Sequence, residues 1–248
     1  MRMSGNTMLI TGGTSGIGRG LARRFHAAGN TVIVAGRREQ PLTAVTAEHP
    51  GMDCVVLDVD DPDSIRDAIA DVVRRHPDLN VVINNAGIML PEDLTDPRDL
   101  DVAERTVTTN LLGPIRVLAQ VVPLLTTQAS ATIINVSSGL AFVPLPMTPT
   151  YSATKAAIHS YTQSLRVQLA GTGVQVIELV PPAVQTDLMG QAARGQGMPL
   201  EAFLTEVMNL LRDHPDAVEI CVPDVLMMRN AEADGRHDEV LAMMSGAH

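Results

Sequence analysis

Aromatic side chains are scarce in this chain of 248 residues, which has three phenylalanines, two tyrosines and no tryptophan. Aliphatic residues and methionine must therefore fill the interior, and the 45% hydrophobic content is enough for a full core. Such interiors suit parallel strands buried on both faces. A length near 250 residues suits one α/β domain. The composition therefore predicts a single domain spanning residues 1–248.

Other absences exclude whole classes of protein. Cys54 and Cys221 are too few and too far apart for a disulfide framework or a zinc site, and the histidines form no metal-spaced pair, so we expect no metal. The net charge of −10, without a basic stripe, argues against a nucleic-acid partner. The N-terminus lacks a secretion signal, and no apolar run approaches the roughly 20 residues of a membrane span. We expect a cytoplasmic protein with no membrane partner.

Lysine is nearly absent, since the only one is Lys155 and every other cationic side chain apart from histidine is arginine. Lys155 follows Tyr151 by four residues, so on a helix its ammonium can approach the phenol. A nearby positive charge favours phenolate and lowers the tyrosine pKa from about 10. The pair predicts that Tyr151 donates and accepts protons. A surface lysine beside a packing tyrosine is the alternative.

Short apolar runs alternate with helical segments along the chain. This alternation predicts βαβ units and a three-layer, Rossmann-like, doubly wound parallel sheet of about seven strands. The expected strands are Thr7–Thr11, Thr31–Ala35, Asp53–Leu57, Asn80–Asn84, Ala131–Val136, Val174–Leu179 and Val218–Val222. The expected helices include Gly16–Ala28, Pro62–Arg75, Arg98–Leu125 (two helices, broken near Gly113-Pro114), Tyr151–Ala170 and Leu200–Leu211.

Residues 187–214 depart from the alternation, because a Pro-Pro step and three glycines precede the helix at Leu200–Leu211. We predict a substrate-loop insertion over the carboxyl edge of the sheet, where open α/β sheets bind ligands. A lid is one interpretation, and an ordinary surface excursion is the other.

A glycine-rich turn, Thr11-Gly12-Gly13-Thr14-Ser15-Gly16-Ile17-Gly18, joins the first strand to the first helix. Glycines let the backbone approach a pyrophosphate, and the helix N-terminus faces its negative charge. The spacing Gly-x-x-x-Gly-x-Gly is wider than that of many dehydrogenases. The turn predicts a dinucleotide site, with a tight turn that binds no ligand as the alternative.

The second strand ends at Gly36, followed by Arg37 and Arg38. An acidic residue at this place would bind the ribose hydroxyls of NAD, whereas a basic residue suits the extra phosphate of NADP. Arginine can grip a phosphate with two hydrogen bonds. We therefore predict NADP(H) over NAD(H). The alternative is a pair of merely solvated arginines.

These features, with four further segments in order, resemble the short-chain dehydrogenase/reductase family in its common short form. The resemblance extends to about Asp187 and implies an NAD(P)-dependent oxidoreductase acting on ketones or alcohols. It also implies a set of cofactor residues, namely Gly12, Thr14, Ser15, Gly16, Ile17, Gly18, Asp58, Val59, Asn84, Ala86 and Gly87. Asp58 and Val59 would hold the adenine, although Asp58 could be a helix cap and Asn84 could simply end a strand.

The resemblance implies that Asn110, Ser138, Tyr151 and Lys155 are the catalytic residues. The asparagine would hold a helix distortion and a water, and the lysine would also bind the nicotinamide ribose. Ser138 precedes Tyr151 by the family's thirteen residues. Two alternatives stay open: Asn110 ends a helix before Gly113-Pro114, or the neighbouring Ser137 faces the site.

After the sixth strand the chain departs from the family pattern, because Pro182 stands where glycine is usual. Proline fixes φ and removes an amide donor, so the loop should be stiffer at its root. Pro181, Val184 and Thr186 would still border the nicotinamide. This Pro-Pro variant resembles a branch of the family named after a lipoteichoic-acid D-alanylation operon.

The expected mechanism has Ser138 and Tyr151 stabilising the carbonyl oxygen while Tyr151 supplies the proton. Apolar residues, namely Met89, Leu140, Phe142, Leu145 and Met189, predict a small hydrophobic carbonyl or alcohol substrate. The alternatives are a 3-oxoacyl reductase acting on carrier-bound chains and a non-catalytic dinucleotide-sensing protein. The family usually pairs through the helices near Arg98–Leu125 and Tyr151–Ala170, which implies a homodimer or homotetramer.

Overall fold

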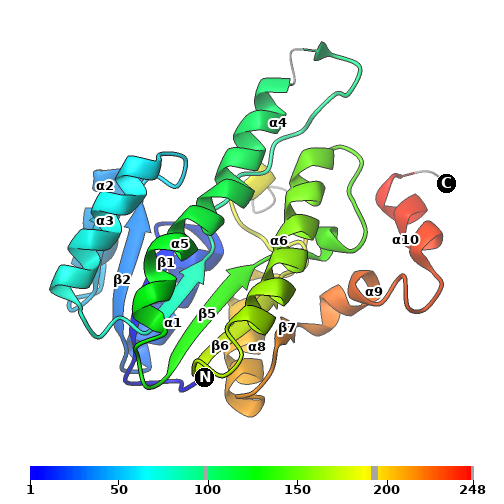
Figure 1. Cartoon of the computed structure of the whole chain (residues 1–248). Coiled ribbons are helices and arrows are strands. Elements are labelled where there is room, and N and C mark those ends of the chain that lie inside the picture. Colours follow the sequence, from blue (N-terminus) through cyan, green and yellow to red (C-terminus); the bar gives the residue numbers. More distant parts are fainter. Residues whose placement is uncertain (98–99, 191–194, 247–248) are drawn as a thin grey trace.

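The fold, a computed structural model that describes residues 1–97, 100–190 and 195–246, is a seven-stranded parallel sheet between two layers of helices (Figure 1). The strand order is β3-β2-β1-β4-β5-β6-β7. This arrangement confirms the predicted Rossmann-like doubly wound fold. The strands are β1 Thr7–Thr11, β2 Thr31–Gly36, β3 Asp53–Val56, β4 Val81–Asn84, β5 Ala131–Val136, β6 Val174–Val180 and β7 Glu219–Cys221.

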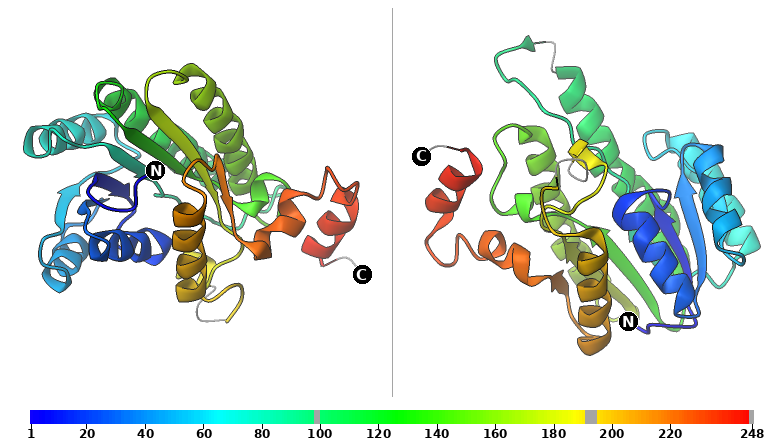
Figure 2. Two further views of the ribbon diagram at one scale, coloured as in Figure 1. Left: turned by 90° about the horizontal axis from the view of Figure 1, so that it is seen from below. Right: turned by 180° about the vertical axis from the view of Figure 1, so that it is seen from behind.

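The helices divide between the two faces of the sheet, as Figure 2 shows in two further views. One core cluster joins the sheet to α1 Gly16–Ala27, α2 Glu39–Glu48 and α8 Leu200–Asp213. The other joins it to α3 Pro62–Arg75, α5 Gly113–Leu125 and α6 Pro149–Gln168. The remaining helical segments are α4 Leu100–Val107, η2 Thr108–Leu112, η3 Gly139–Ala141, η4 Leu188–Gly190, η5 Pro223–Val225, α9 Leu226–Arg229 and α10 His237–Met244.

The central strands form where the apolar runs are continuous rather than alternating. Every residue of β1, β4 and β5 is buried. Continuous apolar runs are what strands need when helices cover both faces of a parallel sheet. The carboxyl ends of β1, β4, β5 and β6 therefore meet at one edge, and the candidate site lies there.

The expected division into two helices is confirmed, since α5 begins at Gly113, but the expected break between them is absent because the helical path continues from Leu100 to Leu125. A π-helical turn, η2, lies where the break was expected, and the Gly113 amide donates to the Thr108 carbonyl. A proline lacks an amide and its ring crowds the preceding turn, whereas a wider π turn relieves both problems. Arg98, the expected start of this helix, lies outside the described residues.

The helix Leu100–Leu125 is also long and apolar enough to meet a length and composition test for a membrane span, with 26 residues and an 18-residue stretch whose mean hydropathy is 1.2. The expectation that no apolar segment approaches that length was therefore too strict. Core helices of soluble proteins meet the same test, and α5 packs on the sheet through Val117, Leu118, Val121 and Leu125. This feature alone is weak evidence for a membrane.

The segment predicted as an insertion contains η4 and α8, and residues 191–194 within it lie outside the description. Its base is closed by hydrogen bonds between two neighbouring stretches of backbone. The Gln185 amide donates to the Met198 carbonyl over 2.9 Å, and the Met198 amide donates to the Ala183 carbonyl over 2.8 Å. The segment therefore leaves and rejoins the domain at one place.

Candidate active site

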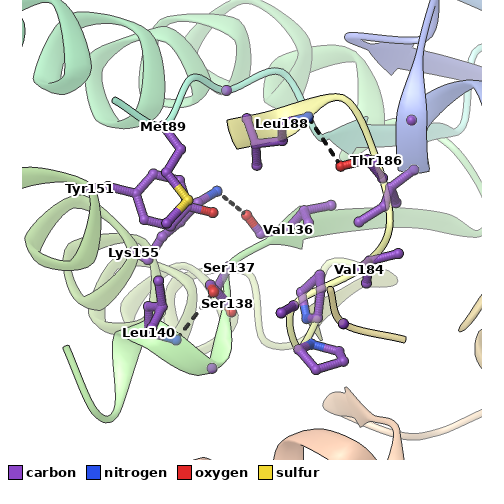
Figure 3. Close-up of a pocket in the computed structure, with 18 of the residues that line it drawn as sticks. Met89, Val136, Ser137, Ser138, Leu140, Tyr151, Lys155, Val184, Thr186 and Leu188 are labelled. Carbon is purple, nitrogen blue, oxygen red and sulfur yellow. Dashed lines mark hydrogen bonds between the residues drawn. The ribbon is translucent and has the colours of Figure 1, made fainter. Parts of the chain in front are cut away.

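A cavity of about 630 Å³ lies at the carboxyl edge of the sheet. Its walls come from the glycine-rich turn after β1, the segment after β4, the β5–α6 connection, α6 itself and the loop after β6 (Figure 3). Three residues from the C-terminal part of the chain also line the cavity, namely Asp224 of η5, Met228 of α9 and Met244 of α10. The carboxyl edge is the place where open α/β sheets bind ligands.

The glycine-rich turn is shaped for close approach of a ligand. Gly12 and Gly16 have φ of +65° and +51°, in the left-handed region that favours glycine. A Cβ on Gly12 would lie 2.9 Å from the Ala86 Cα atom, and one on Gly18 would overlap the Gly12 carbonyl oxygen. Gly12, Ser15, Gly16 and Ile17 line the cavity, while Thr14 and Gly18 support the turn from outside. The turn therefore fits a pyrophosphate at the start of α1.

Asn85, a residue that sequence reasoning did not single out, fastens the turn to the next strand. Its side-chain amide donates to the carbonyls of Thr11 and Gly12 over 3.1 and 3.2 Å. Asn84, predicted to touch the cofactor, instead donates to the Asn135 side chain over 2.9 Å inside the sheet. Asn84 is the last residue of β4 and its side chain is held within the sheet, whereas Asn85, just beyond the strand, lines the cavity.

Tyr151 and Lys155 are both brought into the cavity by α6, as Figure 3 shows. Their relative exposures are only 7% and 6%. The lysine ammonium lies 5.5 Å from the centre of the tyrosine ring and donates to the Val136 carbonyl over 2.8 Å. The four-residue spacing on a helix accounts for this approach.

The electrostatics of the pair differ from the expectation. Burial raises the pKa of Tyr151 to about 12, and a hydrogen bond with Ser138 opposes that rise only in part. Burial lowers the pKa of Lys155 to about 8, opposed by the Glu178 carboxylate. In the protein alone, desolvation outweighs the attraction of the ammonium for a phenolate. Tyr151 is therefore a neutral phenol, and thus a proton donor, at neutral pH.

Ser138 caps η3, where its hydroxyl accepts from the Leu140 amide over 3.1 Å. Both Ser138 and Ser137 line the cavity, but only Ser138 interacts with the tyrosine hydroxyl. This favours Ser138 over Ser137 as the residue that faces the reacting oxygen.

Asn110 lies in the π-helical turn, so the predicted helix distortion is present, but its side chain does not line the cavity. Its carboxamide oxygen accepts from the Ile88 amide, and its nitrogen donates to the Ile88 carbonyl, each over 2.8 Å. A third contact, 3.4 Å long, reaches the Thr154 hydroxyl. The geometry gives Asn110 a role in holding the segment after β4 rather than direct contact with a substrate.

The loop after β6 provides the opposite wall. Pro181, Val184 and Thr186 all line the cavity as predicted. The Pro181 carbonyl accepts from the Gly139 amide over 2.9 Å, which fixes the two walls to each other. Thr186 accepts from the Leu188 amide over 3.3 Å (Figure 3).

The predicted adenosine residues lie outside the cavity, at the neighbouring ends of β2 and β3. Arg37 and Arg38 are exposed. A Cβ on Gly36 would lie 3.2 Å from the Thr14 side chain, so the end of β2 adjoins the glycine-rich turn. The Asp58 carboxylate accepts from the Asp60 amide over 3.1 Å.

That local turn, rather than a helix cap, accounts for Asp58, because Asp61 caps α3. Val59 is buried, and a Cβ on Gly113 would come within 3.0 Å of its Cβ atom. Val59 therefore packs against the start of α5.

Three of the five predicted substrate residues, Met89, Leu140 and Leu145, line the cavity. Phe142 does not, because its ring packs edge-on against His159 at 4.8 Å and lies under Arg229 at 4.6 Å. Met189 also does not line it. Ala86 and Gly87 do, as predicted, and the wall residues that sequence reasoning missed include Leu188, Met198, Met228 and Met244.

Comparison with known proteins identifies relatives that match most of the chain. The model of the short chain dehydrogenase family matches residues 6–197. An uncharacterized oxidoreductase, DltE of Bacillus subtilis, is 40% identical over 208 residues, covering 83% of this chain and 82% of that protein. Sulfoacetaldehyde reductase 2 of Chromohalobacter salexigens is 36% identical over 184 residues, covering 73% of each. A crystal structure of a short chain dehydrogenase from Burkholderia cenocepacia in complex with NADP is 25% identical, covers 98% of both chains and has a TM-score of 0.82.

Proposed function

The chain belongs to the short-chain dehydrogenase/reductase family and is an NAD(P)-dependent oxidoreductase, and we propose that it interconverts a neutral, apolar ketone and its alcohol with NADP(H). The observation that carries this proposal is the placement of Tyr151, Ser138 and Lys155 in one cavity with the glycine-rich turn. The turn that would hold a dinucleotide and the buried phenol border the same cavity.

The residues present fit a nicotinamide dinucleotide. Gly12 and Gly16 leave room for a pyrophosphate at the start of α1, and Lys155, which lines the same cavity, would donate to the nicotinamide ribose. Arg37 and Arg38, exposed beside the turn, suit the additional phosphate of NADP. When bound, the cofactor supplies or accepts the hydride.

The protein's part is to hold the carbonyl oxygen and to move one proton. Ser138 donates a hydrogen bond to the oxygen as negative charge grows on it. Tyr151 delivers its proton to the same oxygen, and the raised pKa of its phenol keeps that proton available at neutral pH. Lys155 places a positive charge next to the phenol as it ionises. The direction that this arrangement favours is reduction.

The substrate class follows from the cavity wall. Met89, Leu140, Leu145, Leu188 and Met198 present apolar surface. Among the described residues that line the cavity, Lys155 is the one cationic side chain, and Asp187 and Asp224 are acidic. A substrate carrying a carboxylate or sulfonate would meet repulsion there, so a neutral substrate is favoured.

The test is oxidation of NADPH in the presence of a panel of neutral ketones, followed by the absorbance of the reduced cofactor. Tyr151→Phe should lower turnover by about 10²–10⁴-fold while NADPH still binds. The matched control is Tyr161→Phe, which changes the other tyrosine on the same helix and should leave turnover unchanged. Equal rates for Tyr151→Phe and the unmodified protein would refute the assignment.

A further inference from the structure

Three polar side chains lie in register across the sheet beneath α6. Asn135 of β5 pairs with Glu178 of β6, and Glu178 pairs with Glu219 of β7. Register partners in a parallel sheet point to the same face. Asn135 donates to Thr162 of α6 over 2.9 Å, so α6 covers this face. Two carboxylates therefore lie side by side under the helix that carries the active-site tyrosine and lysine.

Lys155 and His159 lie one helical turn apart on the surface of α6 that faces the sheet. The ammonium of Lys155 reaches the Val136 carbonyl at the end of β5, and the Nδ1 atom of His159 lies 2.7 Å from the Glu178 Oε2 atom. One turn advances about 5.4 Å along a helix. The Glu178 carboxylate is thus the next group along α6 behind the lysine, on the side away from the cavity.

Glu178 is an unusual residue at this position because its side chain is fully buried, at 0% exposure. Its Oε2 atom contacts His159, while its Oε1 atom has no hydrogen-bond partner within the described part of the chain. A buried carboxylate with one oxygen unpaired is costly unless a nearby positive charge or a functional role compensates for it.

The charges around Glu178 show which cation compensates. The Nδ1 atom of His159 lies against Glu178, and its Nε2 atom lies 3.0 Å from the side-chain nitrogen of Gln163. Arg229 is already engaged with Glu219, at 2.8 and 3.2 Å. Apart from His159, the next cationic side chain along α6 from Glu178 is the buried ammonium of Lys155.

We propose that Glu178 is a positioning residue of the active site, whose buried carboxylate, held in place by His159, keeps the Lys155 amine charged beside the Tyr151 phenol. The inference rests on the function proposed above for Lys155. Without a compensating anion, burial alone would favour the neutral amine. The direction of the electrostatics agrees, because the carboxylate raises the pKa of Lys155 against the larger effect of burial.

The other ionisable groups on the elements around Lys155 contribute less net charge. Tyr151, on the same helix, is a neutral phenol at neutral pH because its pKa is raised to about 12. Glu219 on β7 and Arg229 on α9 form an ion pair and largely cancel each other. Cys221 on β7 is a neutral thiol, since burial raises its pKa to about 11. Glu178 is therefore the anion that acts on the lysine.

A metal ion is the competing explanation, because ligand atoms of His159, Glu178 and Glu219 all lie within 4.8 Å of one another. The Arg229 guanidinium, which holds both oxygens of Glu219, argues against it, since a divalent cation would be placed next to an existing positive charge. The experiment below includes a metal arm.

The test reads the lysine directly and needs no substrate. Because Lys155 is the only lysine, protein labelled with ¹³Cε-lysine gives one side-chain NMR signal, and its chemical shift against pH gives the midpoint of lysine titration. In the unmodified protein the midpoint should lie near 8. Glu178→Gln should lower it by about one pH unit, as expected for the loss of a nearby opposite charge.

Two variants serve as controls. Glu219→Gln removes the neighbouring carboxylate and should leave the midpoint close to that of the unmodified protein. Glu178→Asp keeps the charge and should restore most of the shift, which a purely structural defect would not do. An unchanged midpoint in folded Glu178→Gln, judged by circular dichroism, overturns the proposal. Should Glu178→Gln not fold, the same comparison is made with His159→Gln, which removes the group that holds the carboxylate in place and should also lower the midpoint; an unshifted midpoint there overturns the proposal.

Addition of Zn²⁺ provides the metal arm. A midpoint that moves at micromolar Zn²⁺ in the unmodified protein but not in His159→Gln also overturns the proposal, since the carboxylate then serves a metal. No response to Zn²⁺ supports the proposal.

Turnover separates this inference from the function on which it rests. With a ketone from the panel, loss of activity at alkaline pH should begin at lower pH in Glu178→Gln, following the NMR midpoint. If the midpoint falls while the pH profile of turnover stays the same, the inference about Glu178 holds and the proposed role of Lys155 fails.

Discussion

The carboxamide of Asn110 exchanges two hydrogen bonds with the backbone of Ile88, accepting from its amide and donating to its carbonyl, each over 2.8 Å. Ile88 belongs to the segment after β4, and the next residue, Met89, lines the cavity. The π-helical turn thus fixes a wall of the active site without contacting the cavity itself. A widened turn suits this task, because it turns a side chain out of the regular helical path.

Replacement of Asn110 should therefore affect the cavity indirectly, by loosening the segment after β4 that forms one of its walls. Asn110→Leu leaves the amide and carbonyl of Ile88 without partners, and we expect unfolding free energy to fall by about 2 kcal/mol. NADPH affinity should fall as well, since the segment after β4 lines the cavity proposed to hold the cofactor. Urea unfolding and fluorescence titration with NADPH measure the two effects. Thr108→Ala is the control and should change neither, because the Thr108 hydroxyl, in the same turn, donates only to the Glu104 carbonyl of its own helix over 2.9 Å.

Gly18 tests the shape of the glycine-rich turn. A Cβ there would overlap the Gly12 carbonyl oxygen and the Asn85 side-chain amide, which fasten the turn to β4. We expect Gly18→Ala to abolish measurable NADPH binding and to lower the melting temperature. Gly29→Ala is the control, because Gly29 has φ of +88° but open space around it. That variant should cost only about 1 kcal/mol of stability and retain full cofactor affinity, so equal losses in the two variants would contradict the prediction.

Substitution of Arg37 and Arg38 tests the predicted preference for NADP(H) over NAD(H). Arg37→Asp with Arg38→Ser should weaken NADPH by about tenfold or more, the value of one lost charge-assisted hydrogen bond, and should affect NADH much less. Isothermal titration with both cofactors provides the comparison. The charge-matched control is Arg74→Asp with Arg212→Ser, in the last turns of α3 and α8.

Helix ends of this kind lie at the opposite edge of a parallel α/β sheet, so the control should not change the ratio of the two affinities. A ratio unaltered by the Arg37 and Arg38 substitutions would remove the argument for NADP specificity.

The buried lysine predicts how stability depends on pH. The pKa of Lys155 is about 8 in the folded chain and 10.5 in the unfolded chain, so between these pH values the unfolded state binds more protons. Stability therefore rises as pH increases from about 8 to 10.5, by roughly 3 kcal/mol at most. Tyr151 acts in the opposite sense above pH 10, because its folded pKa is raised to about 12 and the unfolded chain ionises first.

Chemical denaturation at several pH values measures this dependence, and Lys155→Met should remove the rise between pH 8 and 10. A rise that persists in Lys155→Met would assign it to other groups.

Much of the fold was predictable because parallel strands buried on both faces leave uninterrupted apolar runs such as those of β1 and β5. The π turn that leads into Gly113-Pro114 was not predictable, since nothing in the local sequence distinguishes a π turn that accommodates a proline from a helix end. From the sequence pattern alone, Pro114 is interpreted as the end of a helix. In the structure, the π turn one turn earlier removes the steric conflict of the proline ring.

Within the site, Tyr151, Lys155 and the glycine-rich turn were predictable, because their spacing along the chain reproduces their arrangement in space. The choice between Asn84 and Asn85 was not, since it depends on where β4 ends. Phe142 was misplaced because its partners, His159 and Arg229, come from distant parts of the chain. Met228 and Met244 were missed for the same reason, as only the folded C-terminal segment carries them to the cavity.

The closed base of the segment between Gln185 and Met198 bears on how the substrate selectivity of such an enzyme can change during evolution. Both ends of the excursion are anchored to each other, so residues can be added or removed between them without disturbing the strands. Lengthening a loop whose ends stay joined adds only a small, logarithmic entropy cost. Selectivity can thus diverge by exchange of this one excursion, while the proton-transfer residues on α6 are inherited intact.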